Sequence, residues 1–181
     1  MASGPNVGAN LLEAERLIDE AVSQQAQLVV LPENFALMGK TEHDKVAERE
    51  QDGQGPMQEF LAEQSARHGI WLVGGTIPMV ASDDNKIRAA CLVYDDQGRQ
   101  VARYDKIHLF DVELVDSGDQ YNESETIESG DEVVVIDTPF GRMGLSVCYD
   151  LRFPELFRQQ LAIGMEIVVL PSAFTAITGR A

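Results

Sequence analysis

Residues 144–156 read GLSVCYDLRFPEL. An apolar strand pattern ends here on Cys148, and Pro154, a residue type that commonly starts helices, follows six positions later. A cysteine at the end of a buried strand is held rigidly, and its sulfur faces the crevice where open α/β sheets bind ligands. The segment therefore predicts a nucleophile at Cys148. Taken alone, it also fits a structural cysteine, because free cysteines usually pack as small core residues.

The overall composition is typical of a globular domain. The chain has 181 residues, of which 44% are hydrophobic and 24% charged, so we expect one domain over residues 1–181. The net charge of −16 argues against nucleic acids and anionic membranes as partners, because both bind basic patches. No apolar run approaches the roughly 20 residues of a membrane span, and no signal peptide precedes the first helical pattern.

The two cysteines, Cys91 and Cys148, lie in separate apolar, strand-like runs. They do not make a disulfide framework, so the sequence indicates a protein of the reducing cytoplasm. Their separate strands also disfavour a redox role for the pair. There is no CxxC or HExxH motif and no histidine cluster, so we expect neither a metal site nor a cofactor.

Hydrophobic periodicity predicts helices that alternate with strands, as in an α/β fold. Helices are expected over residues 10–25, 56–67 and 154–163, with Asn10 capping the first. Strands are expected over residues 28–31, 70–76, 87–94, 100–104, 133–137, 143–148 and 166–170. Polar or acidic loops are expected over residues 39–55, 82–86 and 111–132.

The connections between these elements set the strand directions. Helical crossovers make the strands that they join parallel, whereas hairpin turns reverse the chain. If the two halves of the chain face the same way, Glu33, Lys106 and Cys148 each follow the end of a strand at the same rim. We therefore expect these three side chains to lie close together.

Three segments around these residues resemble the signature segments of the nitrilase, or carbon–nitrogen hydrolase, superfamily. They are residues 31–35 (LPENF), 104–110 (YDKIHLF) and 148–156 (CYDLRFPEL). Glu33, Lys106 and Cys148 fall, in that order, where the superfamily keeps its Glu-Lys-Cys triad. Residues 121–124 (YNES) are similar to the segment that supplies a second active-site glutamate, which implies Glu123 as a fourth catalytic residue.

The resemblance covers nearly the whole chain and implies a four-layer αββα sandwich. Family members are longer, so we expect an incomplete sandwich that lacks the family's first strand and its C-terminal block. For the full-length protein the resemblance implies a homo-oligomer, specifically a dimer. An incomplete sandwich leaves sheet edges and apolar faces uncovered. An alternative is therefore a catalytically silent chain that acts as a non-enzymatic interaction module.

The triad residues are also chemically suited to one another. A nearby cation favours a thiolate, so we expect Lys106 to lower the pKa of Cys148 while Glu33 takes its proton. Attack on an amide carbonyl then builds an oxyanion, which we expect Lys106 and the backbone N–H of Tyr149 to hold. The resemblance implies that Glu123 positions the substrate and Lys106.

Further residues are candidates for substrate binding. We expect Phe35, Tyr149, Arg152 and Thr175 to line the pocket, with core packing as the alternative for each. His108 is expected to be a structural hydrogen-bonding residue rather than a base.

The residues that follow the cysteine narrow the expected reaction. The nitrile-hydrolysing branch typically has Trp-Glu there, whereas this chain has Tyr149-Asp150, which favours amides. Residues 148–156 and 171–179 most resemble Nit-type amidases, a branch that includes deaminated-glutathione amidases and ω-amidases. The resemblance implies hydrolysis of a small linear carboxamide to a carboxylate and ammonia through a Cys148 thioester. Deaminated glutathione or a related ω-amide is the expected substrate.

Overall fold

A computed structural model of the chain describes residues 1–41, 43–113, 120–174 and 179. Five strands form the larger of two main sheets. They are β1 (Leu28–Val30), β2 (Trp71–Val73), β3 (Ile77–Val80), β4 (Ile87–Tyr94) and β5 (Gln100–Asp105). The long strand β4 pairs antiparallel with β2, β3 and β5, and β1 pairs parallel with β2.

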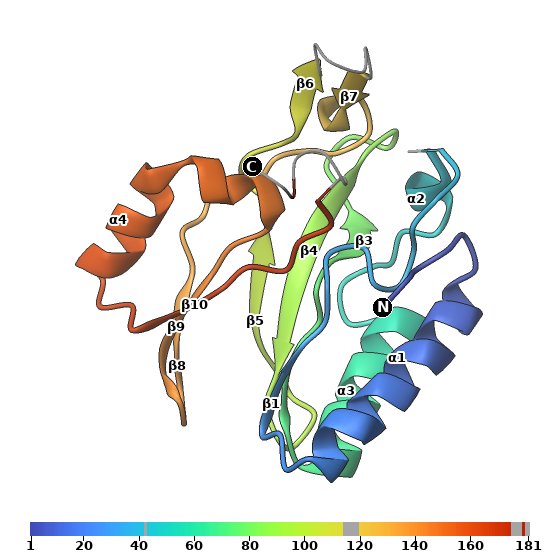
Figure 1. The fold of residues 1–181 in the computed structure, drawn as a ribbon. Coiled ribbons are helices and arrows are strands. Elements are labelled where there is room, and N and C mark those ends of the chain that lie inside the picture. The colour runs from blue at the N-terminus through green and yellow to red at the C-terminus, as the bar shows by residue number, and fades with distance from the viewer. Residues whose placement is uncertain (42, 114–119, 175–178, 180–181) are drawn as a thin grey trace.

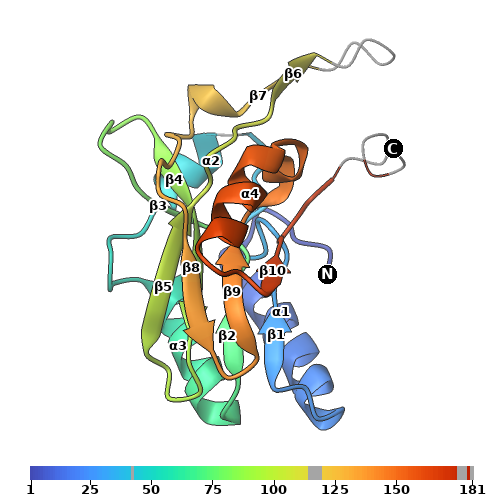
Figure 2. The same cartoon turned by 90° about the vertical axis from the view of Figure 1, so that its left-hand side faces the viewer.

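The smaller main sheet has three strands in the order β10-β9-β8. They are β8 (Val135–Thr138), β9 (Gly141–Leu145) and β10 (Ile167–Val169). A separate antiparallel ribbon of β6 (Asp111–Glu113) and β7 (Gln120–Asn122) projects beyond the ends of both sheets (Figure 2).

The helices cover the outer faces of the two sheets, which pack on each other (Figure 1). Helices α1 (Val7–Ser23) and α3 (Pro56–His68) lie on the larger sheet, and α4 (Pro154–Ala162) lies on the smaller one. The short helix α2 (His43–Ala47) lies near the end of the larger sheet. The layers therefore follow the order helix, sheet, sheet, helix.

Two groups of buried apolar side chains hold these layers together. Ile18 of α1 and Leu61 of α3 pack on Leu72 and Leu92 of the larger sheet. Between the sheets, the buried side chains are Val73, Cys91, Val93, Tyr104, Met143, Leu145 and Val169, among others. Burial of one large apolar side chain stabilises a fold by about 1.5–3 kcal/mol, so both interfaces contribute substantially.

Local sequence explains where most of the elements begin and end. Helix α3 starts at Pro56, whose fixed φ suits the first turn, and ends before Gly69, which adopts the left-handed conformation. Helix α1 starts earlier than predicted, because Asn6 rather than Asn10 accepts the capping hydrogen bond from Ala9 N. Asn10 instead lies buried inside the helix and donates to the carbonyl of Ala36.

The predicted strand directions are confirmed, whereas two predicted loops contain further elements. β1 and β2 are parallel, as are β9 and β10, and the hairpins β4–β5 and β8–β9 are antiparallel. The strand predicted over residues 70–76 ends at Val73, because Gly75 turns the chain with a φ of +52°. A side chain at Gly75 would collide with the backbone of Pro32. The loops predicted over residues 39–55 and 111–132 contain α2 and the β6–β7 ribbon, and β3 lies in a stretch without a predicted element.

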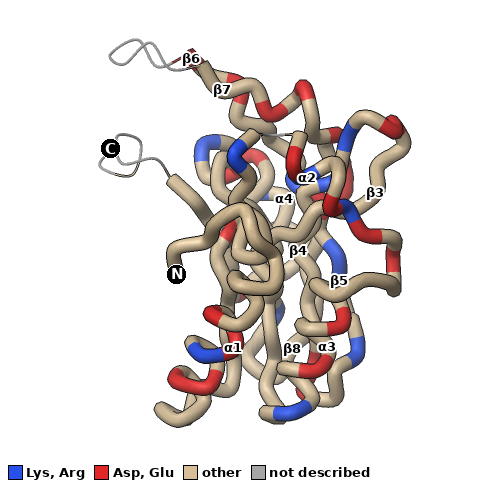
Figure 3. Tube along the Cα trace, turned by 90° about the vertical axis from the view of Figure 1, so that its right-hand side faces the viewer, with Lys and Arg blue, Asp and Glu red and all other residues tan. Residues whose placement is uncertain are grey.

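Charged residues are scattered along the chain trace, most of which is uncharged (Figure 3). Asp and Glu occur along α1 and α3, in the loops beside β3 and near the β6–β7 ribbon, with Lys and Arg between them. Among the described helices, none is both long and apolar enough to cross a lipid bilayer.

Candidate active site

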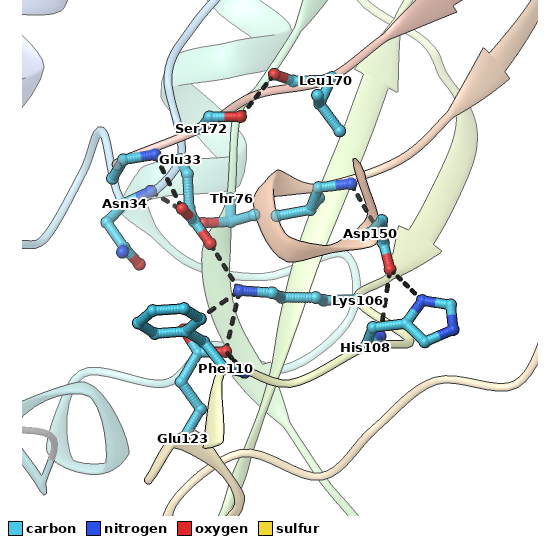
Figure 4. Close-up of polar contacts among 12 residues, drawn as sticks. Glu33, Asn34, Thr76, Lys106, His108, Phe110, Glu123, Asp150, Leu170 and Ser172 are labelled. Carbon is cyan, nitrogen blue, oxygen red and sulfur yellow. Dashed lines mark hydrogen bonds and ion pairs between the residues drawn. The ribbon is translucent and has the colours of Figure 1, made fainter. Parts of the chain in front are cut away.

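Lys106 lies between two carboxylates at the ends of the sheet strands (Figure 4). It directly follows β5, and its Nζ lies 2.8 Å from Glu33 Oε1 and 2.8 Å from Glu123 Oε2. Its side chain is 1% exposed. Burial by itself would lower the pKa of Lys106, but the charges of Glu33 and Glu123 outweigh it and raise that pKa above its ordinary value. Lys106 is therefore held as a cation.

Glu33 is fixed from two sides. It follows β1, and it accepts hydrogen bonds from Lys106 Nζ on Oε1 and from Ala173 N, 2.9 Å away, on Oε2. The next residue, Asn34, has a φ of +55° and donates its N–H to Thr76 Oγ1 at 2.8 Å. This tight turn aims the carboxylate of Glu33 into the interior, where it is 6% exposed.

Cys148 begins the short 3-10 helix η2 (Cys148–Arg152), just after β9. Its φ is +45°, a left-handed conformation that costs a non-glycine residue on the order of 1–3 kcal/mol. A hydrogen bond from Cys148 N to the carbonyl of Pro171, 2.9 Å long, helps to hold this turn. The strained turn places the thiol at the end of the strand, where it is 8% exposed.

The thiol of Cys148 also interacts with the two triad partners. Burial, followed by the charge of Glu33, raises the pKa of Cys148 to about 12, although Ala173 N–H and Lys106 act in the opposite direction. Lys106 lowers this pKa, as expected, but burial and the charge of Glu33 outweigh it. The thiol therefore stays protonated at neutral pH, and a reaction at the sulfur would need a base to take its proton.

Glu123 ties the β6–β7 ribbon to the lysine. It starts the 3-10 helix η1 (Glu123–Glu125) directly after β7, and both its oxygens lie within 3.1 Å of Lys106 Nζ. Its Oε2 also accepts the backbone N–H of Phe110 at 2.9 Å. Glu123 thus fixes the position of Lys106 and of the segment that enters β6.

A cavity of about 670 Å³ opens onto this cluster. Glu33, Glu123 and Cys148 are among its lining residues. The other walls come from the loop around α2, from the β6–β7 ribbon and from the segment after β10. Phe110, Val112, Tyr121, Tyr149 and Phe174 supply much of its apolar surface. The reacting groups therefore share one space large enough for a small organic molecule.

Two of the four residues predicted to bind substrate line this cavity. Tyr149 packs edge-on against Phe110, with ring centroids 5.0 Å apart, and Arg152 lies further along η2. Thr175 falls outside the described residues. Phe35 does not line the cavity: it is fully buried in the core, 6.4 Å from the ring of Phe60. The turn at Asn34 sends the side chains of residues 33 and 35 in different directions.

Several residues at the site were not predicted from the sequence. Lys40 and Lys45 line the cavity from a segment that the sequence indicated only as a polar loop. Ala173 N–H holds Glu33, a backbone contact that no sequence motif reveals. Asp150 is fully buried and forms a hydrogen bond with His108. Its position two residues after Cys148 is the feature of the sequence that could have indicated a place near the site. His108 is a hydrogen-bonding partner, as predicted.

In the part of the chain that the structure describes, no group of three or more His, Cys, Asp or Glu side chains could hold a metal ion.

The two cysteines are expected to differ in their reaction with iodoacetamide. Their pKa values are both raised to about 12, but Cys148 opens onto the cavity whereas Cys91 is fully buried in β4. Cys148 should be alkylated faster at neutral pH, and its rate should rise about tenfold per pH unit below its pKa. Lys106→Met should slow the reaction, because the cation favours the thiolate.

Peptide mapping by mass spectrometry measures both alkylation rates. Protein in concentrated urea, where both thiols are exposed, serves as the control and should show similar rates. Equal rates for Cys91 and Cys148 in the folded protein would contradict an accessible thiol at this site.

Comparisons with known proteins agree with the geometry. The carbon-nitrogen hydrolase family profile matches residues 2–179. The chain is 41% identical to a deaminated glutathione amidase of Yersinia enterocolitica, over 100% of this chain and 63% of that protein. It is 35% identical to the omega-amidase NIT3 of Saccharomyces cerevisiae, over 98% of this chain and 62% of that protein. The chain thus spans less than two thirds of the length of these relatives.

Solved structures give the same result. The crystal structure of Saccharomyces cerevisiae Nit3 superposes with a TM-score of 0.85 at 32% identity, over 99% of this chain and 64% of that one. The crystal structure of the C. elegans NitFhit protein superposes with a TM-score of 0.87 at 34% identity, over 100% of this chain and 44% of that one. With Glu33, Lys106 and Cys148 brought together, the chain belongs to the carbon–nitrogen hydrolase, or nitrilase, superfamily and to its Nit branch.

Proposed function

We propose that this protein is a thiol amidase that hydrolyses a small linear carboxamide to a carboxylate and ammonia. The observation that carries the proposal is the position of Lys106 Nζ, 2.8 Å from Glu33 and 2.8 Å from Glu123, beside a cavity that Cys148 also lines. A base and a nucleophile that line one cavity, with a cation held against the base, are the groups that acyl transfer through a thioester requires.

In the first step the sulfur of Cys148 attacks the amide carbonyl carbon. The thiol proton passes to Glu33 as the sulfur–carbon bond forms, which overcomes the raised pKa of Cys148. The carbonyl oxygen becomes an oxyanion, and the Lys106 ammonium and the backbone N–H of Tyr149 stabilise it. The charge that Lys106 faces therefore grows only as the tetrahedral intermediate forms.

In the following steps the intermediate collapses and the acyl group is released. The carbon–nitrogen bond breaks, and Glu33 donates its proton to the departing ammonia, leaving a thioester on Cys148. Glu33 then takes a proton from a water molecule that attacks the thioester carbon. The carbon–sulfur bond breaks and Glu33 returns its proton to the sulfur, which regenerates the thiol. The acid product loses its own proton to solvent and leaves as the carboxylate. Glu123 keeps Lys106 in place throughout through its two close oxygens.

The lining of the cavity favours a substrate that carries a carboxylate of its own. Lys40, Lys45 and Arg152, three of the chain's 14 Lys and Arg residues, line it. The lining also carries Glu33, Glu113 and Glu123, but Glu33 and Glu123 pair with Lys106. With Lys106 included, the cations outnumber the carboxylates by one, which favours an anionic ligand. The relatives named deaminated glutathione amidase and omega-amidase support deaminated glutathione or a related ω-amide as the substrate.

Hydrolysis assays of this protein, with amides that carry a carboxylate and with neutral amides, test the proposal. Deaminated glutathione and small ω-amides should be hydrolysed, and a neutral amide without a carboxylate should react more slowly. If a protein that is folded by circular dichroism hydrolyses none of these amides, the amidase proposal is contradicted. That result would favour the alternative of a non-enzymatic interaction module.

Arg152→Lys should weaken substrate binding more than it slows chemistry. The planar guanidinium of Arg152 can bind a carboxylate through two parallel hydrogen bonds, which an ammonium cannot reproduce. KM should rise by about tenfold, the scale of one such interaction, while kcat stays within about twofold. Steady-state kinetics measure both constants.

Arg158→Lys provides a matched control for this change. Arg158 lies on α4, pairs with Glu155 and is not among the described residues that line the cavity. It should leave KM unchanged. An unchanged KM in Arg152→Lys would show that Arg152 does not bind the substrate carboxylate.

A homodimer is the assembly that we propose for the full-length protein. The support is the resemblance to the superfamily. Size-exclusion chromatography with light scattering measures the mass of the full-length protein in solution. A mass equal to one chain would contradict the proposed dimer.

A further inference from the structure

Asp150 is a fully buried acid that lies beside the reacting groups without lining the cavity described above. Four donors surround its two oxygens. Oδ2 accepts from Tyr104 Oη and from Val147 N, each at 2.7 Å. Oδ1 contacts His108 Nδ1 at 2.7 Å and accepts from His108 N at 3.1 Å. A carboxylate only accepts, so the His108 nitrogen that faces it carries a proton.

These partners lie on both sides of two catalytic residues. Tyr104 and His108 are each two residues from Lys106, at the end of β5 in the larger sheet. Val147 directly precedes Cys148 and follows β9 of the smaller sheet, and Asp150 itself lies two residues beyond Cys148. One carboxylate therefore joins the segment that carries the lysine to the segment that carries the nucleophile (Figure 4).

The same carboxylate closes the strained turn of the nucleophile. Val147 N donates to Asp150 Oδ2, and Asp150 N donates back to the carbonyl of Val147 at 3.0 Å. Between them lies Cys148 with its φ of +45°. The ring of His108 in turn stacks on Phe153, with centroids 3.7 Å apart and planes 9° from parallel, which fixes the imidazole that Asp150 contacts.

We propose that Asp150 is a positioning residue that sets the distance and orientation between Cys148 and Lys106 across the two sheets. The proposal rests on the amidase function proposed above. Buried carboxylates with all their hydrogen bonds satisfied rigidify their surroundings, and misplacement of a reacting group by about 1 Å can cost a hundredfold in rate. Asp150 is expected to act through geometry, because it does not line the cavity that would hold the substrate.

Two variants test this role by kinetics. Asp150→Asn replaces an accepting oxygen with an NH₂ group that faces donors, and it should lower kcat by about a hundredfold with KM within about twofold. Tyr104→Phe removes only one of the two donors to Oδ2, and it should lower kcat by about tenfold. If Tyr104 acts through Asp150, the double variant should be no slower than Asp150→Asn alone.

Tyr94→Phe is the matched control. Tyr94 is also a buried tyrosine of the larger sheet, but its hydroxyl bonds to Gln100 at 3.2 Å, away from the site. It should leave kcat unchanged. If Tyr94→Phe lowers kcat as much as Tyr104→Phe does, the loss of activity comes from a general disturbance of the larger sheet, and the proposal is wrong. If circular dichroism shows that Asp150→Asn does not fold, kcat of Tyr104→Phe alone decides whether the proposal holds.

A second measurement needs no substrate, so it separates this proposal from the amidase function. In the parent protein, Lys106→Met is expected to slow alkylation of Cys148 by iodoacetamide. If Asp150 sets the geometry between the two residues, the same change in the Tyr104→Phe or Asp150→Asn background should alter the rate by less than about twofold. An equal effect of Lys106→Met in all backgrounds, or normal kcat in both variants, would overturn the proposal.

Discussion

Replacing Cys148 with alanine is expected to lower kcat for amide hydrolysis by at least about ten-thousandfold. The reason is that the variant lacks the sulfur that would form the thioester, and the remaining groups can only stabilise direct attack by water. Lys106, Glu33 and Glu123 keep their contacts with one another, since the ion pairs of Lys106 with the two carboxylates do not involve the thiol. Substrate should therefore still bind, and the loss should appear in kcat.

Intact-mass spectrometry gives direct evidence on the same point. Parent protein that turns over an ω-amide and is quenched in acid should carry an acyl group on Cys148, whereas Cys148→Ala should carry none. Cys91→Ala is the control, because Cys91 lies in the core on β4 and not on the cavity. It should keep the acyl adduct and near-normal kcat. Product release by Cys148→Ala at the parent rate would refute the thioester route.

Replacing Lys106 with methionine is expected to lower kcat by at least about a hundredfold while KM changes little. The negative charge on the substrate that Lys106 faces exists only after the carbonyl carbon has become tetrahedral. Removal of the Lys106 ammonium group therefore destabilises the transition state rather than the bound substrate. One oxyanion donor is worth about a hundredfold to a thousandfold in kcat. Methionine keeps a similar length but provides neither the charge nor the hydrogen-bond donors.

The structure adds a second consequence of this change. Lys106 is the cation between the buried carboxylate of Glu33 and the partly buried carboxylate of Glu123, each 2.8 Å away. Removal of one partner from a buried ion pair typically destabilises a protein by about 3–5 kcal/mol, because the remaining charge is left uncompensated. Lys106→Met should therefore also lower the melting temperature, and the kinetics need to be measured well below it.

Steady-state kinetics and a thermal melt separate these two effects. Arg16→Met makes the same change in net charge at an exposed ion pair on α1, and it should alter neither kcat nor stability appreciably. If Lys106→Met keeps near-normal kcat in a folded protein, Lys106 does not stabilise the oxyanion.

Most secondary structure, and the proximity of Glu33, Lys106 and Cys148, could be predicted from the sequence. Periodic apolar residues predicted α3, β4 and β10, because local spacing reflects which face of an element is buried. Strand directions follow from the connections, so Glu33, Lys106 and Cys148 could be expected at one rim. The 2.8 Å contact between Lys106 and Glu33 agrees with that expectation.

Other features depended on the packing of segments that are far apart in the chain. Phe35 lies in the core and not in the cavity, because the turn at Asn34 and the contact with Phe60 decide its direction. The pKa of Cys148 is raised, because burial outweighs the nearby cation, and the extent of burial is not encoded in any local pattern. Asp150 gains its partners Tyr104 and His108 only when the two sheets meet. Sequence periodicity reports which residues face inward, whereas distances and burial arise from contacts between distant segments, so only the folded structure reveals them.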